Sequence, residues 1–121
     1  MLPKQYRLKN KKAFDATYKQ RQVVSDNFLT LYIGKKKIDS QLPTKIGFVV
    51  SKKLHKRATK RNRIKRLVRE ACRLEIKNNS LKNAEKYMSL IFLPKHQSLN
   101  AGFLDVQKSV KLLLDLSLIH I

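Results

Sequence analysis

The stretch RATKRNRIKRLVREACR, from Arg57 to Arg73, has the clearest helical pattern in the sequence. It predicts a helix over residues 59–77, with Thr59 as the N-cap. Apolar residues recur every three or four positions and form one stripe: Ile64, Leu67, Val68, Ala71 and Leu74. Polar side chains lie opposite this stripe: Asn62, Arg66, Arg69 and Arg73. We therefore expect a helix that packs on a sheet through its stripe and presents guanidinium groups to solvent.

Patterns on both sides of this helix predict the other elements. We expect a helix over residues 10–19, strands over 22–24, 28–33, 45–51 and 86–93, and a last helix capped by Asn100. Residues 34–44 hold three lysines and Pro43, which predicts an exposed hairpin connection. This order is typical of an α+β sandwich of one sheet packed with helices. No linker composition interrupts the chain, so residues 1–115 are predicted to form a single domain.

The charge balance of the chain indicates a polyanionic partner. Its 121 residues hold 28 Lys and Arg against 8 Asp and Glu, a formal net charge of +20. Self-repulsion at that charge destabilises a compact state unless an anion neutralises it. Nucleic acid is the first candidate and an anionic membrane surface the second. With one cysteine, no apolar run long enough to span a bilayer and no signal-peptide pattern, we expect a soluble cytoplasmic protein.

The basic face of the predicted helix favours nucleic-acid binding over simple solvation. A charged helix face is usually just solvated, but acidic residues then alternate with basic ones. Here only Glu70 and Glu75 interrupt the row. Arginine suits phosphate because its planar fork donates two parallel hydrogen bonds.

Several motifs in fixed order resemble bacterial ribonuclease P proteins. They are SKK at residues 51–53, KRNRIKRLVREACR at 60–73, RLKNKKAFDATYKQRQ at 7–22 and FLTLY at 28–32. Together they cover about the first two thirds of the chain, which is far more specific than one basic run. The stretch Leu54-His55-Lys56 departs from the glycine-containing sequence usual after SKK, so the loop that enters the helix is expected to differ.

The resemblance implies a fold and a function. The fold is an α-β-β-β-α-β-α sandwich with a left-handed crossover. The function is that of a protein subunit that helps a catalytic RNA, with Mg²⁺ ions bound mainly by that RNA, to remove the 5′ leader from precursor tRNA as an endonuclease. Its partners are the RNA subunit and precursor tRNA, with no membrane and no DNA. The matching RNA-binding positions are Lys52, Lys53, Arg61, Asn62, Arg63, Lys65, Arg66 and Arg69. The matching leader-cleft positions are Phe14, Tyr18 and Tyr32.

No residue is predicted to carry catalysis or to bind a metal ion. His55, His96 and His120 are scattered, and no cluster of Cys, His or carboxylates has ligand spacing. Three other functions stay open: a small ribosomal or other structural RNA-binding protein, a protein-only ribonuclease, and a helix-turn-helix DNA reader. For the aromatic residues the alternative is a core position, since Phe14 and Tyr18 are spaced i and i+4 on one helix.

The last six residues, LSLIHI at 116–121, are predicted to be a non-native tail. One back-translation, CTG TCT CTT ATA CAC ATC, matches a transposon end used in preparing sequencing libraries. The alternative is a natural apolar end of the last helix. Sequencing the intact locus distinguishes the two, since a natural stop codon directly after LSLIHI would rule out the tail.

Overall fold

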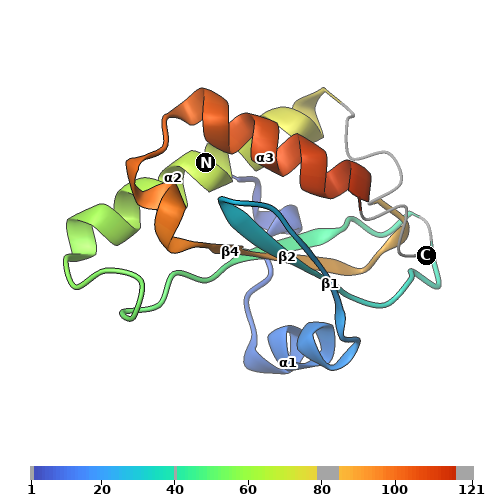
Figure 1. The fold of residues 1–121 in the computed structure, drawn as a ribbon. Coiled ribbons are helices and arrows are strands. Elements are labelled where there is room, and N and C mark those ends of the chain that lie inside the picture. Colours follow the sequence, from blue (N-terminus) through green and yellow to red (C-terminus); the bar gives the residue numbers. More distant parts are fainter. Residues whose placement is uncertain (1, 40, 79–84, 117–121) are drawn as a thin grey trace.

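A computed structural model describes residues 2–39, 41–78 and 85–116 of the chain, and for residue 116 it describes the backbone only. Figure 1 shows a sheet between helices. The elements are, in chain order, η1 (Lys4–Tyr6), α1 (Lys11–Lys19), β1 (Gln22–Ser25), β2 (Leu29–Ile33), β3 (Lys45–Phe48), α2 (Ala58–Lys77), β4 (Ser89–Pro94), η3 (His96–Asn100) and α3 (Phe103–Leu116). The predicted α+β class is confirmed, whereas the predicted tail at 116–121 lies outside the described residues apart from the end of α3.

The strand order in the sheet is β1-β2-β4-β3. Strand β2 is antiparallel to both β1 and β4, whereas β3 is parallel to β4. The prediction of a hairpin across residues 34–44 is therefore wrong, because β4 lies between the two strands that this segment connects. The physical reason is the burial of β4, whose residues from Ser89 to Phe92 are all buried. A strand with both faces buried belongs in the interior of a sheet.

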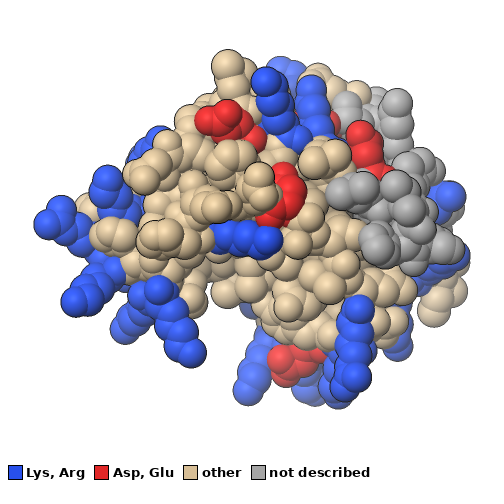
Figure 2. All heavy atoms as spheres, viewed as in Figure 1, with Lys and Arg blue, Asp and Glu red and all other residues tan. Residues whose placement is uncertain are grey.

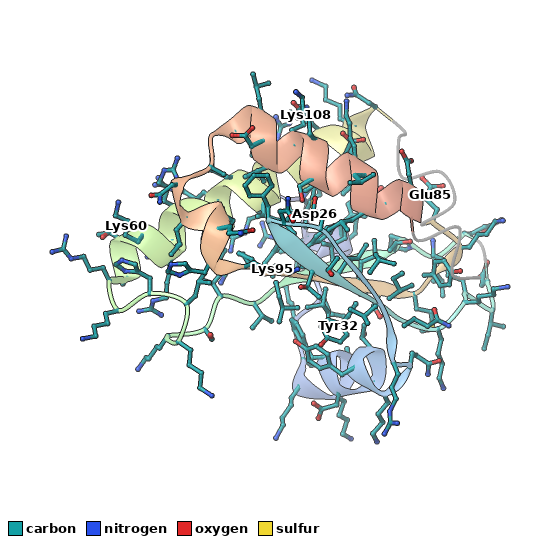
Figure 3. All side chains as sticks on the ribbon, in the orientation of Figure 1. Asp26, Tyr32, Lys60, Glu85, Lys95 and Lys108 are labelled. Carbon is teal, nitrogen blue, oxygen red and sulfur yellow. The ribbon has the colours of Figure 1, made fainter. Side chains whose placement is uncertain are left out.

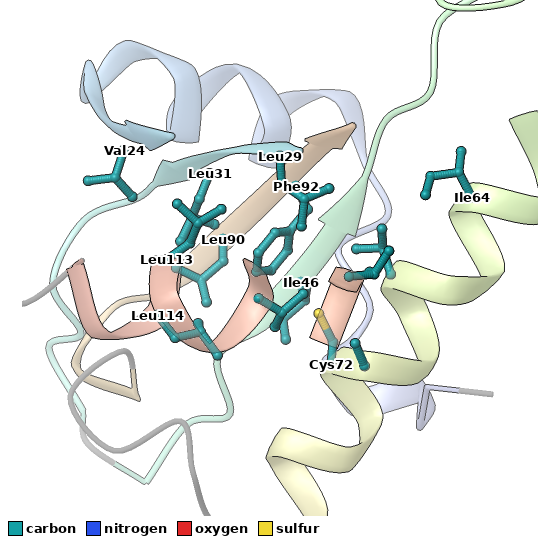
Figure 4. Packing of buried hydrophobic residues seen from close by; sticks show 14 of the residues in the cluster. Val24, Leu29, Leu31, Ile46, Ile64, Cys72, Leu90, Phe92, Leu113 and Leu114 are labelled. Atoms are coloured by element: carbon teal, nitrogen blue, oxygen red, sulfur yellow. The ribbon is translucent and has the colours of Figure 1, made fainter. Parts of the chain in front are cut away.

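The two faces of the sheet are covered by different helices. Helix α1 lies on one face, and α2 and α3 cover the other (Figure 1). Successive side chains of a strand point to opposite faces of the sheet. In β2, Leu29, Leu31 and Ile33 lie on one face and are buried, whereas Thr30 and Tyr32 lie on the other face and are half-buried. Figure 4 shows the resulting core, in which Leu31, Leu90 and Phe92 of the sheet pack beside residues of α2 and α3. Helix α2 also connects the parallel neighbours β3 and β4, so it forms the crossover of the fold.

Helix α2 begins one residue before the expected start. Arg57 occupies its N-cap position, and no side chain caps it, so the prediction of Thr59 as N-cap is wrong. The entering loop sets this start, since the Arg57 amide donates to Nδ1 of His55, 3.0 Å away. Among the stripe residues Ile64, Val68 and Ala71 are buried as expected.

Helix α3 begins later than expected. It starts at Phe103, whereas Asn100 ends η3 and is not the cap. The Asp105 carboxylate accepts a hydrogen bond from the Gly102 amide and satisfies one of the amides at the start of the helix. No described helix has both the length and the apolar composition that a membrane span requires.

Helix α1 is attached to the middle of the sheet. Its N-cap is Asn10, whose side chain accepts a hydrogen bond from the Ala13 amide. On its inner face the buried hydroxyl of Thr17 hydrogen-bonds the Ser89 hydroxyl of β4. The Gly34 amide donates to the Ser89 carbonyl at 2.8 Å, so Ser89 joins α1, β4 and the end of β2.

We expect Gly34→Ala to destabilise the fold by about 1–3 kcal/mol through overpacking. A Cβ at residue 34 would lie 2.2 Å from Oγ and 3.2 Å from the backbone oxygen of Ser89, so Ser89 must shift and its bond to Thr17 is strained. Gly102→Ala is the matched control, because its Cβ would meet nothing closer than 3.9 Å. Urea unfolding measures both. An unchanged urea midpoint for Gly34→Ala would contradict the prediction, because it would show that Ser89 can shift without a loss of stability.

Candidate nucleic-acid interface

A cavity of about 230 Å³ opens where α1, β3, α2 and the N-terminal segment meet. We call it the cleft. Helix α1 contributes Phe14, β3 contributes Gly47 and Phe48, and α2 contributes Lys65 and Arg69. Three residues predicted for the site, one aromatic and two cationic, are thus brought together in a single hollow.

Phe14 owes its place in the cleft to a glycine. A Cβ at Gly47 would lie 2.6 Å from the Phe14 ring, so only a residue without a side chain lets the ring lie on β3. Phe14 is half-buried, with part of its ring exposed to the cavity. It is therefore neither a core residue nor a fully exposed one.

Arg69 is ordered by an aromatic residue that the sequence analysis did not identify. Its guanidinium carbon lies 5.8 Å from the centroid of the Phe48 ring, within the range of a cation–π contact. The Phe48 ring in turn stacks on Phe92 of the core, with centroids 6.3 Å apart and an interplanar angle of 16°. A guanidinium held over a ring keeps its N–H groups in a fixed plane, which suits bidentate binding of phosphate.

Tyr18 and Tyr32 form a second aromatic group beside the cleft. Their ring centroids are 4.9 Å apart at an interplanar angle of 83°, an edge-to-face contact between α1 and β2. Figure 3 shows Tyr32 between the sheet and α1. Both tyrosines are half-buried, and neither lines the cavity that holds Phe14.

The sheet register relates this pair to the cleft. Tyr32 and Gly47 each pair with Ile91, from opposite sides of β4. Phe14 and Tyr18 are one turn apart on α1 and share a face. The aromatic side chains therefore form a row along α1. Desolvation by burial, followed by the electrostatic effects of Tyr32 and Asp15, raises the pKa of Tyr18, so its phenol stays protonated near neutral pH.

The start of α2 and the turn before it form an exposed basic surface. Lys52, Lys53, Asn62 and Arg66 all have exposed side chains. Figure 2 shows Lys and Arg gathered at the end of the molecule where α2 begins. The ion pairs found among the described residues are Arg73 with Glu70 and Lys111 with Glu75, so none of the predicted RNA-binding cations is in one of them.

Two arginines of the predicted set are not simply exposed. Arg61 is half-buried, and its Nε is buried without a hydrogen-bond partner. Arg63 donates to the carbonyl oxygens of Leu99 and Ala101, at 3.3 and 3.0 Å, and so ties α2 to the end of η3. Part of the Arg63 guanidinium is thus occupied within the protein.

Within the described residues no group of three or more His, Cys, Asp or Glu side chains could hold a metal ion. Cys72 is buried, and desolvation raises the pKa of its thiol above the usual range, so it is a core residue and not a ligand or nucleophile.

A family model described as Ribonuclease P matches residues 2–116. The chain belongs to the ribonuclease P protein family. A ribonuclease P protein component from Clostridium kluyveri is 34% identical over 108 residues, which cover 88% of each chain. Another from Clostridioides difficile is 36% identical over 104 residues, covering 86% of this chain and 84% of the relative.

Solved ribonuclease P proteins have the same fold. A structure from Staphylococcus aureus superposes with a TM-score of 0.72 at 26% identity, covering 97% of this chain and 92% of the other. One from Thermotoga maritima gives 0.70 at 23% identity, covering 90% and 96%. The family protein is the RNA-binding subunit of the ribonuclease P holoenzyme, which processes the 5′ ends of tRNA. The comparisons do not favour the ribosomal alternative.

Proposed function

We propose that this chain binds the RNA subunit of ribonuclease P with its basic surface and the single-stranded 5′ leader of precursor tRNA with its cleft. The observation that carries the proposal is the placement of Phe14, Lys65 and Arg69 around one cavity. Unpaired bases stack on aromatic rings, and cations beside the ring hold the backbone. A paired strand would hide its base faces, so the combination suits a single strand.

We assign different roles within the RNA-binding set. The exposed side chains Lys52, Lys53, Asn62 and Arg66 suit phosphates of the RNA subunit, whereas Lys65 and Arg69 hold the leader backbone. Arg61 lies near the start of α2 and is half-buried, and we assign the rest of its guanidinium, apart from the buried Nε, to an RNA phosphate. Arg63 fixes α2 against η3 and acts as a positioning residue, since its described hydrogen bonds go to Leu99 and Ala101.

The physical contribution of the protein is then electrostatic as well as geometric. Two RNAs repel each other, and a chain with net charge +20 between them lowers that repulsion. Cleavage itself is assigned to the RNA subunit, with Mg²⁺ held mainly by RNA, as membership of the ribonuclease P protein family implies. We place the assembly in the cytoplasm, where its RNA partners are made.

The basic surface is tested by the salt dependence of RNA binding. Changing Arg61, Arg66 and Arg69 together to Gln should weaken holoenzyme assembly and reduce the slope of log K against log salt by about 1–2. Each lost phosphate contact removes about 0.7–0.9, and of the three residues Arg61 and Arg66 are assigned to the RNA subunit. The matched control, which we call the reference triple, changes Lys36, Lys86 and Lys108 to Gln. These lysines are exposed and lie away from the cleft, with Lys108 on α3 (Figure 3).

Both triple variants remove three charges, so net charge alone affects them equally. A slope that falls by the same amount in both would mean that the α2 face is merely solvated. Binding can be followed by titrating fluorescent RNA subunit with protein at several salt concentrations.

A further inference from the structure

A second hollow adjoins the cleft on the other side of the N-terminal segment. It encloses about 570 Å³ and is lined by, among others, Lys4, Arg7, Lys9 and Lys45. We call it the N-terminal groove. Residues 7–9 line both the groove and the cleft, so the two hollows share one wall.

That shared wall is fixed to the sheet. Arg7 forms a parallel bridge with Ile46, and the Leu8 amide donates to the Ile46 carbonyl at 3.0 Å. The segment therefore lies as an extended strip beside β3, and its side chains have defined positions. Nε of Arg7 donates to the Leu2 carbonyl at 2.7 Å, which holds the start of the chain against the cleft.

The charged residues that line the groove are all cations. None of the described residues that line it is acidic, and neither ion pair described above involves its cations. Lys4, Lys9 and Lys45 are all exposed, so their ammonium groups can reach a ligand in the groove. Among the described residues the Lys45 ammonium donates one long hydrogen bond, of 3.4 Å, to the Gln5 carbonyl. Such a concentration of like charge is costly unless a polyanion occupies it.

The groove differs from the cleft in having no aromatic wall. Phe14 and Phe48 line the cleft, but no aromatic ring is among the described residues that line the groove. Lysine binds phosphate as a point charge and does not read bases. The groove is thus suited to the backbone of a nucleic acid and not to its bases.

We infer that the N-terminal groove binds the sugar–phosphate backbone of leader nucleotides beyond those held in the cleft. This inference rests on the proposed function, since the strand must first occupy the cleft. Its consequence is that the protein senses leader length independently of leader sequence. Lys4, Lys9 and Lys45 supply the charge, and Arg7 positions the strip between the two hollows.

The test compares precursor tRNAs with no leader, a leader of about 4 nucleotides and one of about 16, the ends of the usual range of single-strand site sizes. Holoenzyme assembled with a bacterial ribonuclease P RNA is titrated with each. The groove variant carries Lys4→Gln, Lys9→Gln and Lys45→Gln, and the reference triple is the control. For the long leader, the groove variant should lower the salt slope by about 2, because a single-strand contact contributes about 0.7. Raising the salt from about 50 to 200 mM should therefore weaken the binding of wild type roughly 20-fold more than it weakens the binding of the groove variant.

For the short leader and the leaderless tRNA, the groove variant should bind like wild type. Equal losses for both leader lengths would overturn the inference, because the lysines would then contact the RNA subunit or the tRNA body. An unchanged long-leader affinity would overturn it as well. If wild type itself bound leader-bearing and leaderless tRNA equally, the proposed function would fail, and the groove inference with it.

Discussion

Highly purified protein, free of RNA, should leave precursor tRNA intact at any Mg²⁺ concentration, whereas the same protein added to a bacterial ribonuclease P RNA at low Mg²⁺ should produce mature 5′ ends. The described residues provide neither a cluster that could hold a metal ion nor a reactive thiol, since Cys72 is buried. Phosphodiester hydrolysis requires groups that stabilise the attacking and leaving oxygens. A cationic protein instead reduces RNA–RNA repulsion, so its effect should be greatest when Mg²⁺ is scarce.

The same experiment includes the triple Arg61, Arg66 and Arg69 variant, which should lose the stimulation at low Mg²⁺ and regain it as Mg²⁺ rises. Gel analysis of end-labelled precursor shows both results. Robust metal-dependent cleavage by protein from which all RNA has been removed would contradict the assignment of catalysis to RNA.

The second large effect concerns the paired tyrosines. Changing Tyr18 and Tyr32 together to Ala should weaken binding of a long-leader precursor by about 5- to 150-fold, the effect of losing one stacked base at about 1–3 kcal/mol. Binding of mature tRNA should hardly change. Because any base can stack, the loss should depend little on leader sequence. Equilibrium binding to the reconstituted holoenzyme measures the ratio of the two affinities.

Two controls separate this outcome from a structural defect. The double change to Phe keeps both rings and their edge-to-face contact, so it should retain the leader preference of wild type. Thermal melts show whether the Ala variant stays folded, because truncating core residues would cost several kcal/mol. An Ala variant that melts near wild type and keeps the wild-type ratio of precursor to mature tRNA binding would exclude these tyrosines from the leader site.

The local elements were predictable because neighbouring residues determine them. The apolar stripe from Ile64 to Leu74 placed α2 within one residue of its observed start, and Asn10 marked the start of α1. The cap predictions at Thr59 and Asn100 were wrong because tertiary contacts of the preceding loops, through His55 and η3, decide where each helix begins.

The position of β4 depends on pairing between distant residues. The sequence predicted a strand over residues 86–93 but not its neighbours in the sheet, and the composition of residues 34–44 suggested a hairpin there. Pairing of Ile91 with both Tyr32 and Gly47 is a property of the whole fold and leaves no local pattern.

The site was predictable as a set of residue types but not as an arrangement. Motif resemblance identified Phe14, Lys65 and Arg69, and the fold brings them together. It could not indicate that Phe48 orders Arg69, because that contact joins β3 to α2. Nor could it indicate that Arg63 hydrogen-bonds carbonyls 36 and 38 residues away.

The most direct test of leader binding in the cleft is to map where the leader touches the protein. A precursor tRNA with a photoreactive nucleotide in its leader is bound to the holoenzyme and irradiated, and the crosslinked peptides are identified by mass spectrometry. We predict crosslinks to Phe14 and its neighbours on α1, to Gly47 and Phe48 of β3, and to Lys65 and Arg69 of α2. Crosslinks confined to α3 or to residues 35–39, with none in the cleft, would contradict the proposal.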